Sequence, residues 1–235
     1  MILFLSLVER TFFQISPLAS DDQDTSLETT ASTVEDNQQE VPHVDDRRKE
    51  AERLLQTMNY FVYCIVNRSC SGVTRECFDL LEVICIGASN DHDPDLATGC
   101  QANLCWFASA ILTREIIGDF LDAVDRILLN CPSWKAKTAI LDVLQASVFC
   151  NMPTIRTKLV WMAKVTSIVA YSGLNADHVE VRGKAGVVLA GLLHCNFIDN
   201  MKIKELIAMF KKMASAKRHS GIIGLCAFVS AFPYR

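Results

Sequence analysis

Apolar residues recur at spacings of three and four along most of this chain, which is the period of an amphipathic α-helix. The pattern begins at Arg47, and its first clear stretch contains Leu54, Leu55, Met58, Phe61, Val62 and Ile65. Runs of β-branched residues, such as residues 83–86, lie inside longer helical periods and are weak strand signals. The pattern predicts an all-α fold from residue 47 onward.

Short groups of turn-forming residues interrupt the helical pattern. They lie at residues 67–71, 89–94, 130–133, 151–153, 172–177 and 196–200. Helices of about five turns that are separated by such short breaks pack as antiparallel hairpins. We therefore expect an array of helical hairpins.

An internal repeat predicts the kind of array. A series of one basic residue, one small or apolar residue and two apolar residues occurs three times, at Lys137, Ile140, Val143 and Leu144, at Arg182, Ala185, Val188 and Leu189, and at Arg218, Gly221, Gly224 and Leu225. The first two copies start 45 residues apart and the last two 36 apart, close to the roughly 40 to 47 residues of HEAT and armadillo units. This predicts an α-solenoid of degenerate HEAT-like or armadillo-like hairpins, a fold that presents long surfaces to large partners.

Each residue type in the series has an expected structural role. A small residue lets two helices approach closely, and the basic residue can reach an acidic group or a helix C-terminus of the neighbouring unit. Trp134, beside the Pro132 turn, is expected to open a helix and to anchor it against the preceding helix pair.

Charge divides the chain into two parts. Residues 1–46 contain ten acidic residues and one basic residue, whereas the remainder contains 17 acidic and 22 basic residues. Residues 20–46 are rich in Ser, Thr, Asp, Glu and Gln, and we interpret them as a disordered acidic insert. Residues 1–19 are interpreted as the end of an upstream helix or a non-native start, and residues 47–235 as the repeat array, incomplete at its C-terminal end.

Composition argues against several classes of protein. The small basic surplus after residue 46 gives no strong nucleic-acid signal, so we expect no direct DNA binding. No apolar run approaches the roughly 20 residues of a membrane span, and no membrane association is expected. The ten cysteines are scattered without a CxxC pair, which favours buried free thiols in a reducing compartment.

Few residues suggest chemistry. His92 lies between Asp91 and Asp93, a group that could hold a metal, but a turn in which Asp93 or Asp95 caps a helix that starts near Pro94 explains it better. Gly-rich phosphate loops and the GxSxG and HExxH motifs are absent, so we expect a non-catalytic binding protein without a cofactor.

A basic series near the C-terminal end has two interpretations. It could contact a polyanion or an acidic partner, or it could be the solvated face of a helix over residues 201–215 whose Ile203, Leu206, Ile207 and Phe210 point inward. The series comprises Lys202, Lys204, Lys211, Lys212, Lys217 and Arg218.

Three segments resemble the C-terminal part of the large HEAT-repeat proteasome activators. They are residues 133–151 (SWKAKTAILDVLQASVFCN), 180–197 (EVRGKAGVVLAGLLHCNF) and 217–234 (KRHSGIIGLCAFVSAFPY). The resemblance implies part of a protein that caps the α-ring of the 20S core particle and promotes degradation without ATP or ubiquitin. It also implies acetylated histones as partners, roles in DNA repair and spermatogenesis, a nuclear and cytoplasmic location, and possible inositol phosphate binding in the full-length protein. A generic HEAT or armadillo scaffold or transport adaptor is the alternative.

The resemblance implies two particular sites. Asn196 and Phe197 match an acetyl-lysine-binding motif, in which the amide donates to the acetyl carbonyl and the ring covers the methyl group. The alternative is a left-handed helix cap at Asn196 with Phe197 packed below it. Tyr234 occupies the penultimate position that family members use to dock on the core particle, but it aligns with an internal residue, and we expect no docking there.

Overall fold

The computed structural model describes Lys49, Arg53, Gln56, Val73, residues 75–216 and residues 218–233. The predicted segments 1–19 and 20–46, together with Lys217 and Tyr234, lie outside the described residues. All regular secondary structure within the described ranges is helical. No helix among them is long and apolar enough to cross a membrane.

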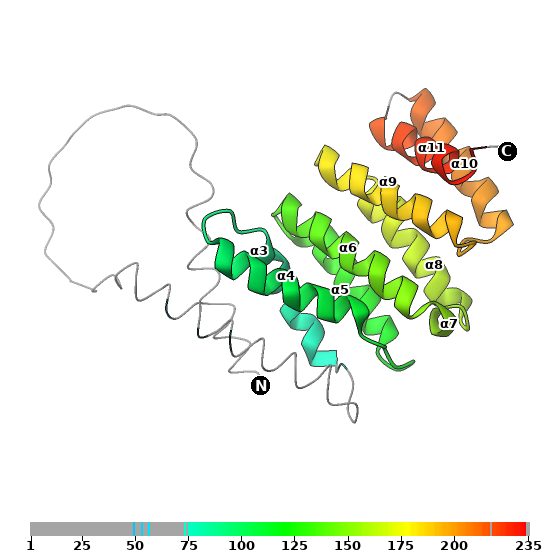
Figure 1. Ribbon diagram of the computed structural model, residues 1–235. Coiled ribbons are helices and arrows are strands. Elements are labelled where there is room, and N and C mark those ends of the chain that lie inside the picture. Colours follow the sequence, from blue (N-terminus) through cyan, green and yellow to red (C-terminus); the bar gives the residue numbers. More distant parts are fainter. Residues whose placement is uncertain are drawn as a thin grey trace, which may run out of the picture.

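The described helices follow one another as antiparallel hairpins (Figure 1). In chain order they are η2 (Arg75–Leu80), α3 (Leu81–Ala88), α4 (Pro94–Ser109), α5 (Ile117–Asn130), α6 (Trp134–Cys150), α7 (Met152–Ile155), α8 (Leu159–Ser167), the π-helical turn η3 (Ile168–Gly173), α9 (Val179–His194), α10 (Asn200–Ser215) and α11 (His219–Ala231).

Helices from successive hairpins pack in two rows. The first row consists of α4, α6, α9 and α11, and each of these helices packs against the next. In the second row α5 packs against η2 on one side and against α8 and η3 on the other. Helix α10 packs on α11, and α9 packs on η3. This stacking of hairpins confirms the predicted all-α solenoid.

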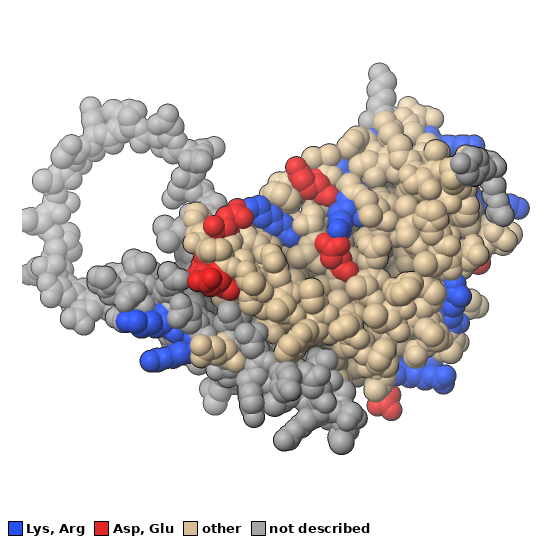
Figure 2. All heavy atoms as spheres, in the orientation of Figure 1, with Lys and Arg blue, Asp and Glu red and all other residues tan. Residues whose placement is uncertain are grey.

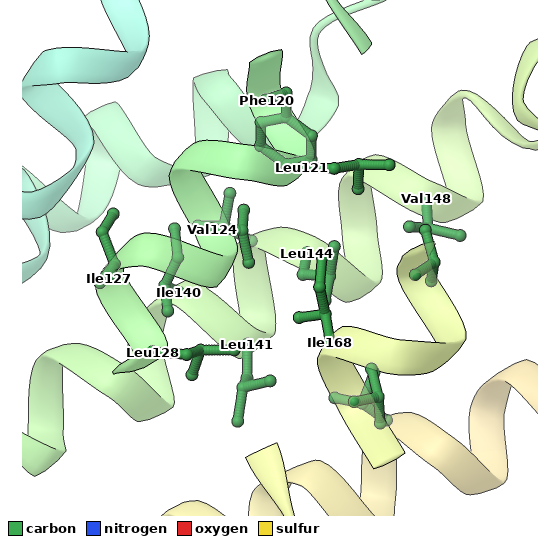
Figure 3. Packing of buried hydrophobic residues seen from close by; sticks show 14 of the residues in the cluster. Phe120, Leu121, Val124, Ile127, Leu128, Ile140, Leu141, Leu144, Val148 and Ile168 are labelled. Carbon is green, nitrogen blue, oxygen red and sulfur yellow. The ribbon is translucent and has the colours of Figure 1, made fainter. Parts of the chain in front are cut away.

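One continuous apolar core lies between the two rows. Figure 3 shows its centre, where Phe120 and Val124 of α5, Ile140 and Leu144 of α6, and Ile168 of η3 converge. All five side chains are at most 2% exposed. Because each buried aliphatic or aromatic side chain contributes about 1.5–3 kcal/mol, packing between rows dominates the stability of the array.

Polar contacts between units repeat at the spacing that the sequence predicts. Arg75 pairs with Asp119 at 2.8 Å, Lys164 with Asp122 at 2.8 Å, and Ser172 donates a hydrogen bond to Asp125 at 2.6 Å. The partners are 42 to 47 residues apart in the chain, one HEAT unit. The hydrogen bond from Lys164 to Asp122 raises the pKa of the lysine.

The small residues of the repeated series allow close helix contacts, as predicted. Gly221 of α11 lies so near α10 that a Cβ atom there would approach the Ala214 nitrogen to 2.4 Å. At Gly224 a Cβ atom would lie 2.6 Å from the Phe210 ring. Ala185, the small residue of the preceding copy, packs closely on Gly173 of η3.

In the middle copy of the series, the basic residue has a different role from the one predicted. Arg182 donates hydrogen bonds to the carbonyls of Ala176 and Asp177, in the connection that precedes its own helix. Arg156 instead makes the contact to the next unit, with hydrogen bonds to the carbonyls of Cys195 (2.6 Å) and Asn196 (3.1 Å) at the end of α9. It occurs in a turn, outside the repeated series, and the periodicity of the helices does not reveal it.

Four of the six predicted breaks are confirmed, the break at residues 67–71 lies outside the described residues, and the break at 151–153 overlaps the short helix α7. Connections after α4 and after α7 were not among the predicted breaks. Connections occur at residues 89–93, 131–133, 174–178 and 195–199, and Asp93 caps α4 by accepting a hydrogen bond from the Leu96 amide, with Pro94 in the first turn. The chain also leaves the helix at residues 110–116, a stretch without Gly or Pro. That connection is held by a distant side chain, Asn151.

The prediction that Trp134 opens a helix is confirmed, but the aromatic contact of its ring is to the following unit and not to the preceding one. Trp134 is the first residue of α6, after the N-cap Ser133, whose hydroxyl accepts a hydrogen bond from the Ala136 amide. Its ring is only half-buried, and it stacks on His178 of the following unit with ring centroids 6.0 Å apart. The indole therefore joins α6 to the following unit, where it contacts the connection before α9.

The expectation of buried free thiols is confirmed in part, because the described cysteines form no disulfide but only half of them are buried. Among the described cysteines Cys77, Cys85, Cys100 and Cys131 are buried, whereas Cys105, Cys150 and Cys226 are exposed and Cys195 is half-buried. The exposed thiols lie on helices of the first row, at positions that point away from the core. Burial raises the pKa of Cys100 to about 12 and raises the pKa of Cys85 further.

Candidate functional site

A groove of about 930 Å³ opens between the α3–α4 hairpin and α6. Its floor is formed by apolar side chains of α4 and α6, and its ends carry polar and aromatic groups. The lining residues are Ala88, Ser89, Asp91, Gln101, Leu104, Cys105, Ala108, Trp134, Lys135, Thr138, Ala139, Asp142, Val143, Gln145, Ala146 and Phe149.

Aromatic side chains stand at opposite ends of α6 in this groove. Trp134 lies at the start of the helix, fixed by its contact with His178, and the Lys135 ammonium lies 5.8 Å from the indole centroid. Phe149 lies at the other end, and 69% of its surface is exposed. Exposed aromatic side chains that flank an apolar floor are characteristic of protein-binding surfaces, because they bury a large area with little loss of side-chain entropy.

Ion pairs between units border the groove. Lys135 of α6 pairs with Asp91 in the connection between α3 and α4, and Lys184 of α9 pairs with Asp142 of α6. The hydrogen bond from Lys135 lowers the pKa of Asp91. These groups are largely exposed and contribute little to stability. Figure 2 shows the result, a largely uncharged face on which red and blue side chains adjoin one another.

Side-chain amides on both walls can recognise polar groups. Gln101 on α4 donates a hydrogen bond to the Ala88 carbonyl at 3.3 Å. Gln145 lies on α6, 44 residues further along the chain, which is one repeat unit. An amide offers a donor and an acceptor, which matches a peptide group. The described residues contain no group of three or more His, Cys, Asp or Glu that could hold a metal ion. The groove is therefore suited to binding a polypeptide segment.

Asn196 and Phe197 lie apart from this groove, at the end of α9. Asn196 has a φ of 49°, in the left-handed region. Its backbone N–H donates to the Leu193 carbonyl, and the backbone N–H of Phe197 donates to the Leu192 carbonyl. These two bonds form the Schellman cap that was the alternative interpretation. The Phe197 ring is fully buried. Acetyl-lysine binding by this pair stays a prediction.

The basic series is spread along a helix and does not line the groove. Lys204, Lys211, Lys212 and Arg218 are exposed, and Lys202 pairs with Glu205 at 3.0 Å, which raises the pKa of Lys202. Leu206 and Phe210 of α10 are buried beneath them. This arrangement is that of a solvated helix face, and binding of a polyanion or an acidic partner stays a prediction. Lys217 lies outside the described residues.

Sequence reasoning missed the groove, although one signal pointed to it. Gln101 and Gln145 are 44 residues apart, as are Asp91 and Lys135, so outward-facing polar residues recur with the same period as the core. A comparison of the outward positions of successive units, in addition to the apolar ones, would have placed these residues side by side.

The fold is that of a helical-repeat protein with an open groove between successive units. No family model matches the sequence. The sequence is 26% identical over 250 residues to proteasome activator complex subunit 4A of Danio rerio, in an alignment that covers 96% of this chain and 13% of that protein. It is 27% identical to subunit 4B of the same species over the same coverage, and 26% identical to human proteasome activator complex subunit 4 over 81% of this chain.

The resemblance inferred from three short segments thus extends over nearly the whole chain. The chain spans about 13% of the length of the Danio rerio proteins that it matches. The chain therefore aligns with one segment of these longer proteins.

Proposed function

We propose that this chain is part of a proteasome activator that caps the α-ring of the 20S core particle and promotes degradation without ATP or ubiquitin. The observation that carries the proposal is the alignment of 96% of the chain with proteins named as proteasome activator subunits. The stacked hairpins support it, because a solenoid of this kind presents the long surface that contact with a large ring requires.

Direct binding to purified 20S core particles tests this proposal. The chain is immobilised, and core particles are passed over it at 50 and 150 mM salt. A helical-repeat scaffold of similar length and unrelated sequence serves as the control. Saturable binding that the control does not show supports the proposal, whereas equal signals from both proteins contradict it.

In this proposal the chain acts as a regulator without catalytic residues. The groove contains one exposed thiol, Cys105, and no base among the described residues forms a hydrogen bond with it that would activate it. Peptide hydrolysis should therefore depend entirely on the core particle. Hydrolysis of a fluorogenic peptide by the purified chain alone, sensitive to Cys105→Ser, would refute this.

The finer functions implied by the resemblance belong to the same proposal. We infer roles in the degradation of acetylated histones, in DNA repair and in spermatogenesis, and a location in nucleus and cytoplasm. Inositol phosphate would bind the full-length protein, for which the exposed Lys204, Lys211 and Lys212 supply positive charge here. Equal affinity of wild type and Asn196→Ala for an acetylated histone peptide would remove the acetyl-lysine site from this account.

The groove favours a second candidate, a scaffold or transport adaptor that binds extended segments of partner proteins. Its apolar floor, two aromatic side chains and amide groups match a peptide with apolar side chains. Core-particle binding separates the candidates, because an adaptor would bind peptide in the groove without binding the core particle.

A further inference from the structure

Three successive connections of the solenoid are tied together along one edge. The Leu112 amide donates to the Asn151 side-chain oxygen at 2.7 Å, and the Asn151 amide nitrogen donates to the Ala110 carbonyl at 2.9 Å. One unit further on, Arg156 donates to the carbonyls of Cys195 and Asn196. Residues 110–116, 151–158 and 195–199 are thus neighbours, on the side of Figure 1 where α7 lies. We name residues 110–116, 151–162 and 195–205, which are these connections with the adjoining starts of α8 and α10, the turn edge.

Each unit contributes exposed apolar side chains to the turn edge. The exposed fractions are 70% for Ile111, 78% for Leu159, 76% for Val160 and 69% for Met201. A single exposed apolar residue is ordinary on any protein, but a row of them at equivalent places in successive units indicates an interaction surface. Leu159 and Val160 are adjacent in the first turn of α8 and form the centre of this row.

The turn edge is also positively charged. It contains five basic residues, Arg114, Arg156, Lys158, Lys202 and Lys204, and three acidic residues, Glu115, Asp199 and Glu205. Asp199 caps α10 by accepting a hydrogen bond from the Lys202 amide, and Glu205 pairs with the Lys202 side chain. Blue side chains predominate on the corresponding rim in Figure 2.

The positive charge near Leu159 is held in place. The Lys158 ammonium lies 4.3 Å from the Trp161 ring centroid, and Trp161 is only 8% exposed. The hydrogen bonds of Arg156 go to neutral carbonyls, which leaves its charge uncompensated. Two cations of restricted mobility therefore lie beside the most exposed adjacent apolar pair among the described residues, Leu159 and Val160. This arrangement is complementary to acidic groups around an apolar depression.

The opposite edge has no surplus of positive charge. Its connections lie at residues 89–93, 131–133 and 174–178 and between α10 and α11, and they carry Asp91, Asp93, Asp177 and Arg218. The first helical turns that follow add Asp95, Lys135, Lys137, Glu180 and Arg182. This edge exposes Leu129 and Val179, but it lacks an adjacent pair of exposed large apolar side chains among the described residues. Within the described residues, only the turn edge therefore combines a surplus of basic residues with a row of exposed apolar side chains.

We propose that the turn edge is the surface through which this chain docks on an acidic, apolar-lined face of the 20S core particle, an inference that rests on the proposed function. If a second copy packed its turn edge against the turn edge of this chain, like charges would come together, which disfavours self-association. An anionic membrane requires a denser cluster, about four to eight Lys or Arg side chains with few acids between them. A protein surface with acidic groups around apolar depressions fits the turn edge, where basic residues lie beside a row of exposed apolar side chains.

The test compares the affinities of variants for purified 20S core particles. The first variant carries Leu159→Ser with Val160→Ser, and the second carries Lys204→Glu, a residue exposed on α10. Matched controls are Val187→Ser, 58% exposed on α9, and Lys211→Glu, exposed on α10 beyond the turn edge. Melting temperatures within two degrees of wild type establish that each variant folds.

We expect the double variant to bind about tenfold more weakly, as removal of a central apolar anchor does. Lys204→Glu should weaken binding by about threefold at 50 mM salt and less at 200 mM, because salt screens a charge at the rim of an interface. Both controls should bind within twofold of wild type.

The possible contrary outcomes are distinct. Unchanged affinity of the folded edge variants, with wild type still bound, overturns the inference and leaves the proposed function standing. Failure of the wild-type chain to bind core particles overturns the proposed function and the inference with it. If the edge variants instead abolish binding to vesicles of anionic phospholipid, or abolish a dimer seen in sedimentation, the turn edge serves a membrane or a second copy and the inference is wrong.

Discussion

Two glycines of the first row have opposite structural roles. A Cβ atom at Gly224 would lie 2.6 to 2.7 Å from three atoms of the Phe210 ring, so this glycine sets how closely α10 and α11 pack. At Gly183 of α9 a Cβ atom would meet nothing within 4 Å. The same residue type is therefore required at one position and unnecessary at the other.

This contrast predicts opposite effects of alanine. Gly224→Ala should lower the free energy of unfolding by about 1–3 kcal/mol, because the added methyl group displaces a buried ring. Gly183→Ala should raise it by about 0.5–1 kcal/mol, because alanine favours the helix and has space. Urea denaturation measures both. A Gly224→Ala protein as stable as wild type would contradict the packing described here.

Cys100 makes stability depend on pH. Burial raises the pKa of this thiol to about 12 in the folded protein, whereas an ordinary thiol ionises near pH 9. The folded state therefore binds the proton more tightly than the unfolded state. The contribution of Cys100 is fully present below pH 9 and is lost as pH rises from 9 towards 12.

The expected signature is a pH-dependent effect of Cys100→Ala. The difference in unfolding free energy between wild type and this variant should shrink between pH 8 and pH 11, as wild type loses the contribution of the thiol. Thr98→Ala, an exposed change on the same helix, serves as the control, with a difference that stays constant. A constant difference for Cys100→Ala would show that the thiol is not shielded from ionisation.

Among the elements, the connection between α4 and α5 depends on a side chain from the following unit. Asn151 is 1% exposed, and it bonds to the Leu112 amide, to the Ala110 carbonyl and to the Ser147 carbonyl. Removal of its amide leaves buried backbone groups without partners.

We therefore expect Asn151→Ala to destabilise the protein by about 2–4 kcal/mol, the cost of leaving a buried donor and acceptor unpaired. Hydrogen exchange at Leu112 should accelerate more than exchange in α11. Asn175→Ala is the matched control, since Asn175 is exposed and its side-chain amide donates to the Tyr171 carbonyl within the same turn of chain, so its cost should stay below about 1 kcal/mol. Equal effects of the two substitutions would contradict the role of Asn151.

The elements also show what the sequence could predict. Apolar periodicity and local caps predicted most helices of the array, because their determinants, such as Asp93 and Pro94 before α4, lie within a few residues of the helix ends. The connection at residues 110–116 was missed because its determinant, Asn151, lies about 40 residues away. The groove was missed for the same reason, since its walls come from α4 and α6 of different units.

At the scale of the whole molecule, polar contacts between successive units recur at regular intervals along the described residues. Ion pairs and hydrogen bonds join residues 39 to 47 positions apart on both rows and along the turn edge, so each unit fixes its neighbours. In such an array each unit contacts only its neighbours, and stacking creates the extended surfaces through which repeat proteins bind large partners.

The central claim is that this chain can serve as a segment of a proteasome activator. The most direct measurement replaces the matching segment of the Danio rerio subunit 4A, to which 96% of this chain aligns, with this chain, and follows fluorogenic-peptide hydrolysis by purified 20S core particles. The control replaces the same segment with an unrelated helical-repeat scaffold of equal length. The account predicts that the chimera with this chain retains at least half of the native stimulation while the control chimera loses it. A soluble, folded chimera that stimulates no better than the control would contradict the account.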